Sequence, residues 1–209
     1  MADVTKNHIV VTPGSGSGNT TLQVKASPAN MGNRVAQVAN FTVTAPGVTP
    51  DKTFKATLAA AQEFVSFDNG TEMSVAKAGG SIVIEGTSNS DKLTFSKGAG
   101  AIVSADITKI AYKVNTSTNA TSGTAITGDP GASAKFTFQL TLTATANTTT
   151  SERTQQITVT TTGNKTATIT LKQSAGDAYL TVTPTEITVP QDGTAVQVEV
   201  NTNTTFTVS

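Results

Sequence analysis

The stretch Gly193 to Ser209, GTAVQVEVNTNTTFTVS, decides the fold because it repeats an earlier part of the same chain. It aligns without gaps on Gly80 to Ser96, GSIVIEGTSNSDKLTFS, and the residues that precede the two stretches are also alike. Within the later stretch, Ala195 to Val200, AVQVEV, alternates apolar with polar side chains, which is the pattern of a β-strand with one buried face. The last nine residues, NTNTTFTVS, therefore predict a strand whose neighbouring strands lie in another part of the molecule.

A second internal repeat relates the front of the chain to its middle. The segment Asn33 to Ala61 parallels Ser151 to Gly176. Their apolar positions align as three pairs: Phe41 with Ile157, Val43 with Val159, and Leu58 with Leu171. Internal repeats of this kind indicate a chain assembled from similar units. The sequence predicts one complete domain at 62–176, the second half of a domain at 1–61, and the first half of that domain at 177–209.

The same alternation runs through most of the chain. It is clearest at Lys135 to Ala146, Gln155 to Thr162 and Thr166 to Lys172, and clusters rich in Gly, Asn and Pro separate such runs. The abundant threonines suit extended backbone because their β-carbon is branched. Only Ala56 to Phe64 has a helical appearance, and it is too short and uncapped to compete with a strand followed by a linker. We expect an all-β fold of two β-sandwiches, one of them split between the two ends of the chain.

Composition excludes several classes of partner. The 209 residues are 36% hydrophobic, which is enough for two small cores. Basic and acidic residues number 14 each, so there is no basic surface for nucleic acid or anionic lipid. There are no cysteines, which excludes disulfides and thiolate metal sites, and no stretch reaches the length of a membrane span. We expect neither nucleic acid nor a membrane as a partner.

Residues that could carry chemistry are few. Thr12 to Thr21, TPGSGSGNTT, lacks the spacing of a phosphate-binding loop and precedes a strand, so it predicts a hairpin connection. His8 is the single histidine and is expected on an ordinary strand, which leaves no multi-histidine site. Asp68, Glu72 and Asp91 lack the spacing of a calcium loop, and sandwiches seldom form the cleft that a glycosidase carboxylate pair needs. The sequence predicts no catalytic residue, metal or cofactor.

These strand and turn patterns resemble those of BACON domains, which are immunoglobulin-like modules common in Bacteroidetes proteins. Residues 179–209 resemble the opening half of such a domain, and residues 8–61 resemble its closing half. The family often places a Trp on the strand that ends TFTVS, whereas this chain has Phe206 there, Leu93 at the matching place, and no Trp at all. The organisation of the whole chain also resembles capsid decoration proteins of crAss-like bacteriophages, which infect the same group of bacteria.

The resemblance implies a non-enzymatic structural protein on the exterior of a phage capsid, made in the host cytoplasm, with capsid proteins and copies of itself as partners. A half-sandwich exposes an apolar face and open strand edges, so it must be completed. We expect residues 177–209 to complete residues 1–61 either in the same chain or in a neighbouring subunit. The short linkers favour the neighbouring subunit. The donor residues are the apolar ones of the tail: Leu180, Val182, Ile187, Val189, Val196, Val198, Val200, Phe206 and Val208.

An alternative function is a carbohydrate- or mucin-binding module of a Bacteroidetes surface protein, with a host-surface glycan as its ligand. A third is a fragment of a longer adhesin. Sugar sites usually need exposed aromatic rings that stack on the sugar. Five phenylalanines on alternating strands are expected to be buried: Phe41, Phe95, Phe136, Phe138 and Phe206. That leaves Tyr112 and Tyr179 as candidates for a sugar.

Overall fold

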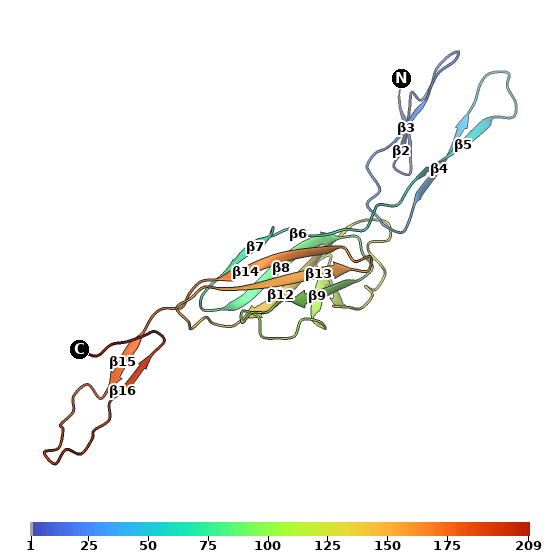
Figure 1. Cartoon of the computed structure of the whole chain (residues 1–209). Helices are drawn as coiled ribbons and strands as arrows, with labels where there is room; N and C mark the ends of the chain where they lie inside the picture. Colours follow the sequence, from blue (N-terminus) through green and yellow to red (C-terminus); the bar gives the residue numbers. More distant parts are fainter. Residues whose placement is uncertain (1) are drawn as a thin grey trace.

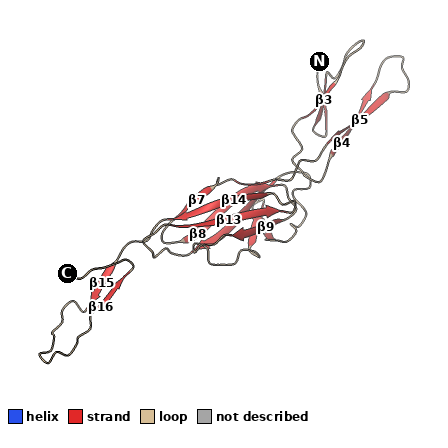
Figure 2. Cartoon of the chain, viewed as in Figure 1, coloured by secondary structure: helices blue, strands red, loops and turns tan. Residues whose placement is uncertain are grey.

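The computed structural model describes residues 2–209 and shows an all-β protein, which confirms the predicted fold class. Three groups of strands follow one another along a long axis (Figure 1). We call residues 2–61 the N-terminal arm, residues 62–176 the central sandwich and residues 177–209 the C-terminal arm. Figure 2 shows that most of the long strands belong to the central sandwich, and that the two arms project from its opposite ends.

The central sandwich consists of two sheets that pack on one core (Figure 1). One sheet has the strand order β11-β10-β12-β8-β6, and the other has the order β7-β14-β13-β9. All neighbouring strands are antiparallel except β7 and β14, which are parallel. The strands are β6 (Val65–Phe67), β7 (Glu72–Val75), β8 (Gly80–Ser88), β9 (Leu93–Lys97), β10 (Ala111–Val114), β11 (Thr118–Thr121), β12 (Phe136–Ala144), β13 (Arg153–Thr161) and β14 (Thr166–Gln173).

Alternating side chains build the core of this sandwich. Along β12, Phe138 and Leu140 point inward while Thr141 faces solvent, as the period of two requires. Phe95 packs edge to face against Phe138, with ring centroids 5.8 Å apart. Gly86 in β8 has no side chain because a Cβ there would collide with the Phe138 ring. Twenty-two hydrophobic residues are buried together. Burial of each larger aliphatic or aromatic side chain among them contributes about 1.5–3 kcal/mol to stability.

The N-terminal arm contains a three-stranded sheet, β1-β2-β3, and a separate β4-β5 pair. Its core is small: Ile9, Val11, Ala39 and Phe41 are buried, and the Phe41 ring stacks on Phe54 at 5.1 Å. The long connection between β2 and β3 is the predicted hairpin loop. The strands are β1 (Val4–Lys6), β2 (Ile9–Thr12), β3 (Gln23–Ala26), β4 (Gln37–Val43) and β5 (Lys52–Leu58).

The prediction that His8 lies on a strand is wrong. His8 and Asn7 form the two-residue turn between β1 and β2, and both have positive φ, at 63° and 46°. A two-residue hairpin of this kind needs positive φ at both central positions, which asparagine tolerates well and histidine better than most residues. The single imidazole of the chain is therefore exposed at a turn.

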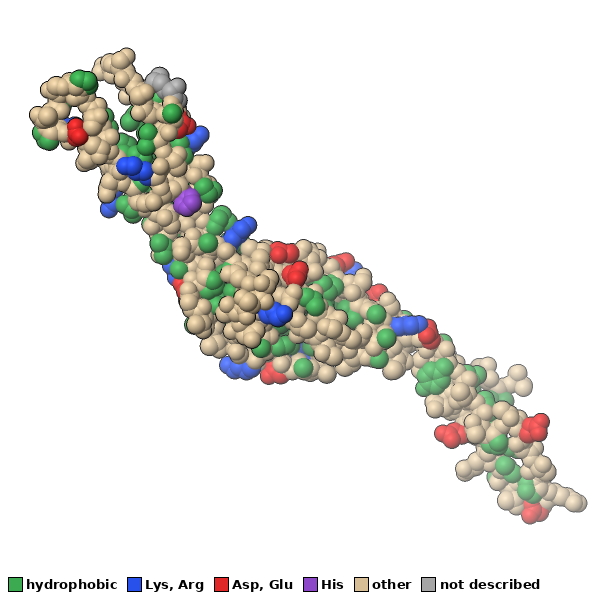
Figure 3. All heavy atoms as spheres, turned by 180° about the vertical axis from the view of Figure 1, so that it is seen from behind, with side chains coloured by type: hydrophobic (Ala, Val, Ile, Leu, Met, Phe, Trp, Pro, Cys, Tyr) green, Lys and Arg blue, Asp and Glu red, His purple; other side chains and the backbone are tan. Residues whose placement is uncertain are grey.

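The C-terminal arm contains one two-stranded sheet, β15 (Leu180–Thr183) with β16 (Glu199–Thr202). None of residues 177–209 is buried. Hydrophobic side chains lie on the surface of both arms, as the space-filling view in Figure 3 shows. The C-terminal arm thus has one sheet and lacks the second layer that buries the apolar face of a sheet, whereas the two sheets of the N-terminal arm cover one another only in part.

Candidate functional site

The nine predicted donor side chains lie on the C-terminal arm, and all are accessible to solvent. Eight of them are exposed, from 40% at Val198 to 88% at Val208, and Val200 is partly buried. Scattered apolar side chains are normal on a surface, but a run of them on one segment marks an interaction surface. Their role as donors stays a prediction, and their exposure is compatible with it.

The N-terminal arm carries a matching set of exposed apolar residues. Val24 on β3 is 47% exposed, although it lies opposite the buried Val11 of β2. Directly opposed residues of an antiparallel pair share one face of the sheet, so Val24 belongs to the core face. Val43 on β4 is 48% exposed, although Phe41, two residues earlier on the same face, is buried. Within residues 2–209, β3 and β4 each have a free edge beside these side chains.

Asn89 joins the N-terminal arm to the central sandwich. Its side chain is fully buried, and its Oδ1 accepts a hydrogen bond from the backbone N–H of Phe64 at 2.9 Å. Its Nδ2 donates to the carbonyl oxygens of Gln62 and Met31, both at 3.0 Å. Because Met31 belongs to the N-terminal arm, the amide holds that arm against the first residues of the central sandwich. A buried amide with three partners fixes this geometry well.

Asn203 makes the same three contacts at the other end of the molecule. Its Oδ1 accepts from the backbone N–H of Tyr179 at 3.1 Å. Its Nδ2 donates to the carbonyl oxygens of Asp177 at 2.8 Å and of Thr148 at 2.9 Å. Thr148 belongs to the central sandwich, so Asn203 holds the C-terminal arm to the sandwich as Asn89 holds the sandwich to the N-terminal arm. In addition, Lys77 of the sandwich pairs with the Asp177 carboxylate at 2.6 Å.

The arm side of the first junction is organised by Asn30. Its Nδ2 donates to the carbonyl oxygens of Val35 at 2.8 Å and Ala59 at 3.2 Å, and its Oδ1 accepts from the N–H of Gly32 at 3.1 Å. The carbonyl oxygen of Gly32 accepts in turn from the N–H of Ala61 at 2.6 Å. These bonds close the loop before β4 onto the segment after β5.

Asn147 repeats this arrangement at the second junction. Its Nδ2 donates to the carbonyl oxygens of Ser151 at 2.8 Å and Ser174 at 3.0 Å, and its Oδ1 accepts from the N–H of Thr149 at 3.1 Å. The carbonyl oxygen of Thr149 accepts from the N–H of Gly176 at 2.7 Å. The two junctions therefore share one set of hydrogen bonds, and sequence reasoning missed all four asparagines because a single polar residue has no periodicity.

These hydrogen bonds correct two details of the sequence alignment. Asn203 takes the place of Asn89, whereas the gapless alignment sets Thr202 on that residue. Ala59 takes the place of Ser174, so Leu58 corresponds to Gln173 and not to Leu171. The errors arise because the loops of the two copies differ in length, which a gapless comparison cannot represent.

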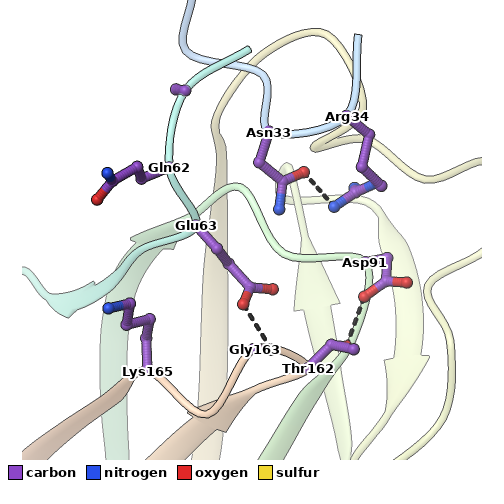
Figure 4. A pocket seen from close by; sticks show the side chains of 9 residues that line it. Asn33, Arg34, Gln62, Glu63, Asp91, Thr162, Gly163 and Lys165 are labelled. Carbon is purple, nitrogen blue, oxygen red and sulfur yellow. Dashed lines mark hydrogen bonds between the residues drawn. The ribbon is translucent and has the colours of Figure 1, made fainter.

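A pocket at the first junction is the other candidate site (Figure 4). The Glu63 carboxylate in it accepts hydrogen bonds from the Gly163 N–H at 2.6 Å and the Thr161 hydroxyl at 2.9 Å. The Asp91 carboxylate accepts from the Thr162 hydroxyl at 2.5 Å. Both carboxylates of the pocket are thus bonded to one turn, and their geometry favours a structural role over acid–base chemistry.

Asp68, Glu72 and Asp91 do not come together as a calcium site. Asp68 accepts from the Thr87 hydroxyl at 3.2 Å, and Glu72 pairs with Lys172 at 2.8 Å. The hydrogen bond that the Lys172 ammonium donates to the Glu72 carboxylate raises the pKa of Lys172. Residues 2–209 contain no group of three or more metal-ligating side chains. No helix in these residues is long and apolar enough to cross a membrane.

The aromatic residues divide between core and surface. Tyr112 is buried against Phe95, with ring centroids 5.1 Å apart, and this burial raises the pKa of Tyr112 to about 12. It is therefore inaccessible to a sugar. Tyr179 is exposed, and its hydroxyl lies 3.3 Å from Asn201 Oδ1. The predicted burial is confirmed for Phe41, Phe95, Phe136 and Phe138, and it is wrong within one chain for Phe206, which is 50% exposed because its arm has no second sheet.

No protein-family model matches the chain, and a search of curated proteins finds no significant match.

Proposed function

We propose that this protein is a non-enzymatic structural component of a phage virion that decorates or reinforces the capsid surface. Its units are immunoglobulin-like sandwiches of the BACON type, one of which is divided between the two arms. The observation that carries the proposal is the recurrence of one set of junction hydrogen bonds at Asn89 and Asn203, with an incomplete group of strands beyond each junction.

The contrast between a well-packed central sandwich and two incompletely packed arms supports this role. The central sandwich has a large core, whereas each arm leaves apolar side chains accessible beside free strand edges. Exposed edges of this kind pair readily with strands of another chain. In a coat around a capsid, each donated segment would link two positions and so reinforce the lattice.

Several polar side chains of the described residues hold the backbone in place at the junctions. Asn30, Asn89, Asn147 and Asn203 bind backbone groups at the junctions, and Glu63 binds a turn. Asn89 and Asn203 bond across the junctions and so hold adjoining units together, while Asn30 and Asn147 close the loops on which those bonds depend. A structural protein that must hold its parts in a defined order needs this kind of contact.

The proposal is tested by locating the protein. Mass spectrometry of phage particles purified through a density gradient is expected to detect it at an abundance comparable to that of capsid proteins. The host outer-membrane fraction of uninfected cells serves as the comparison. Detection in that membrane fraction, with none in purified virions, would overturn the virion role.

A glycan-binding module is the second candidate, favoured by the exposure of Tyr179 and Phe206 on the same arm. Exposed aromatic rings can stack on the apolar face of a sugar. In that case mucin glycans would bind the full chain, and Tyr179→Ala and Phe206→Ala would each abolish binding in a glycan-array measurement. Phe64→Ala, at the corresponding place in the central sandwich, is the control and would leave binding unchanged.

A further inference from the structure

We infer that the partner of each arm is a second copy of this chain, joined head to tail. The C-terminal arm of one copy packs on the N-terminal arm of the next, and together they form a sandwich in which the strands of the two arms pair as β12 pairs with β8 and β13 with β9 in the central one. This inference deepens the proposed structural role and rests on it only for the setting on a virion. It is carried by the register of the strands, by charge, and by the positions of the two arms.

The register of the first sheet follows from the junction asparagines. Because Asn203 takes the place of Asn89, Val196 and Val198 take the places of Ile82 and Ile84 on β8. Gly193 supports the same count: it has φ +80° and bonds Pro190, as Gly79 has φ +72° and bonds Ala76. The inward face of the C-terminal arm is thereby assigned to its valines.

The N-terminal arm offers the strand that this face requires. In the central sandwich, Ile82 lies opposite Leu142 of β12. Leu22, Val24 and Ala26 precede Asn30 with the alternation that Leu140, Leu142 and Ala144 show before Asn147, the spacing being one residue longer. In the composite sheet, Val24 of one copy therefore lies opposite Val196 of the other. Both valines are exposed in the single chain, and pairing buries both.

The second sheet is completed in the same manner. Val43 takes the place of Val159, which lies opposite Phe95 of β9 in the central sandwich. The loop that follows Asn203 is one residue shorter than the loop that follows Asn89, so Phe206 takes the place of Leu93 and Val208 that of Phe95. Val43 of one copy therefore meets Val208 of the next. These are among the most exposed large hydrophobic residues of their arms, at 48% and 88%. Each of these two exposed valines thus lies where the other arm would supply the missing neighbouring strand.

The parallel strand also has a partner. In the central sandwich, Met73 and Val75 of β7 lie beside Leu171 and Gln173 of β14. The corresponding residues of the C-terminal arm and of β5 meet in the composite sandwich as two pairs: Ile187 with Ala56, and Val189 with Leu58. Burial of these aliphatic side chains removes apolar surface from water, which favours association and opposes the cost of ordering the arm.

The two arms have opposite charge. Residues 177–209 contain four acidic residues and no Lys or Arg, whereas residues 2–61 contain five Lys or Arg and two Asp. Figure 3 shows the acidic side chains on the C-terminal arm and basic side chains on the N-terminal arm. Complementary charge speeds the encounter of two surfaces and opposes wrong pairings, here between two like arms. A second copy supplies this complement from its own sequence.

The position of the arms excludes closure within one chain in this conformation. They project from opposite ends of the central sandwich, and the hydrogen bonds of Asn89 and Asn203 hold each arm in that direction (Figure 1). An arm that meets the opposite arm must therefore belong to another molecule. A head-to-tail contact that does not close into a ring produces an open linear array.

Assembly is tested with the full chain in analytical ultracentrifugation. The unchanged protein is expected to form oligomers whose mass increases with concentration. Val24→Lys blocks the N-terminal arm and Val198→Lys blocks the C-terminal arm, and both positions are exposed in the single chain, so the fold is kept. Each variant alone is expected to remain monomeric, and an equimolar mixture is expected to stop at the dimer, because one intact arm of each kind remains.

Val83→Lys is the matched control. Val83 is 41% exposed on the central sandwich, so this variant is expected to assemble like the unchanged protein. An unchanged protein that stays monomeric at every concentration would overturn the inference, whether small-angle scattering finds it compact or extended. Oligomers that survive both Val24→Lys and Val198→Lys would overturn it as well, because another surface would then carry them.

Cysteine crosslinking tests the register. The chain has no cysteine, so a disulfide can form only at introduced positions. A mixture of Val24→Cys and Val196→Cys is expected to give a crosslinked dimer under mild oxidation, whereas Lys25→Cys with Val196→Cys is not, because Lys25 points to the other face. Equal crosslinking of both mixtures would overturn the register. Virion fractionation remains independent: a chain that assembles but is absent from virions loses the decorating role and keeps this inference.

Discussion

The central sandwich and the C-terminal arm have related sequences but opposite relations to solvent. Ile84 is fully buried in the sandwich, whereas Val198, at the corresponding place in the arm, is exposed. Leu93 and Phe206 differ in the same way. The strands themselves are alike, and the difference lies in whether a second sheet is present to cover them. Burial therefore depends on which strands the chain makes available, as the context dependence of β-structure requires.

The largest expected effect comes from cutting the two regions apart. Residues 63–175 alone are expected to unfold in one cooperative thermal transition followed by circular dichroism, because both sheets and the core remain. Residues 177–209 alone are expected to give the spectrum of a disordered chain, since a two-stranded sheet is marginal in water. A central segment without a cooperative transition would show that the boundaries at 62 and 176 are misplaced.

Truncation of corresponding side chains in the two regions should lower the free energy of unfolding by amounts that differ by several kcal/mol. Ile84→Ala is expected to lower the free energy of unfolding by about 2–5 kcal/mol because it leaves a cavity in the core. Val198→Ala is expected to change it by less than about 0.5 kcal/mol in dilute, monomeric protein. Urea titrations of both variants measure the difference. Comparable losses at the two positions would mean that the C-terminal arm is packed within the single chain.

The junction asparagines should have an intermediate effect. Asn89→Ala removes three hydrogen bonds that a buried amide makes to partly buried backbone groups, and we expect a loss of about 1–3 kcal/mol of stability. Asn203→Ala is expected to leave the sandwich stable and to speed hydrogen exchange at the Tyr179 amide, which it bonds. Asn119→Ala, at an exposed position of β11, is the control. Unchanged exchange at Tyr179 would argue against Asn203 as the contact that holds the arm.

The smallest effect concerns pH. Burial raises the pKa of Tyr112 to about 12 from an ordinary value of 10.0, so the unfolded chain loses this proton first as pH rises. The stabilisation by Tyr112 is complete below pH 10 and declines towards pH 12, with a loss of about 1 kcal/mol at pH 11. Tyr112→Phe is expected to remove that decline in urea titrations at pH 9 and pH 11. Identical pH dependence of the two proteins would contradict the burial effect.

Sequence periodicity predicted the strands well because alternation and burial share one period. The predicted strand Lys135 to Ala146 contains β12. Ala56 to Phe64, which has a helical appearance, contains no helix, and its first residues are the end of strand β5. Register was predicted less well. The valines Val196 and Val198 have the same period as Ile82 and Ile84, so a shift of one residue preserves the alternation while it exchanges the two faces. The hydrogen bonds of Asn203 resolve this ambiguity, and the alternation of the sequence contains no information about them.

The candidate site could be predicted in part. The apolar residues of 177–209 were named from sequence alone, and their role as an interaction surface stays a prediction. The recurrence of asparagine at 30, 89, 147 and 203 was a signal that a gapped comparison of the repeats would have revealed. The direction in which the arms project could not be predicted, because it depends on junction contacts between residues distant in sequence, such as Asn89 with Met31.

The repeated junction has a consequence for symmetry. Asn89 and Asn203 make the same bonds to the unit that precedes each of them, so an array assembled as inferred would contain two similar junctions per chain. The ion pair of Arg34 with Asp129 belongs only to the first junction and that of Lys77 with Asp177 only to the second, so the exact repeat of the array would be the whole chain and its approximate repeat a single sandwich. In the Fourier transform of a micrograph, the strong layer line would correspond to the sandwich, and the length of the chain would contribute only a weak line between.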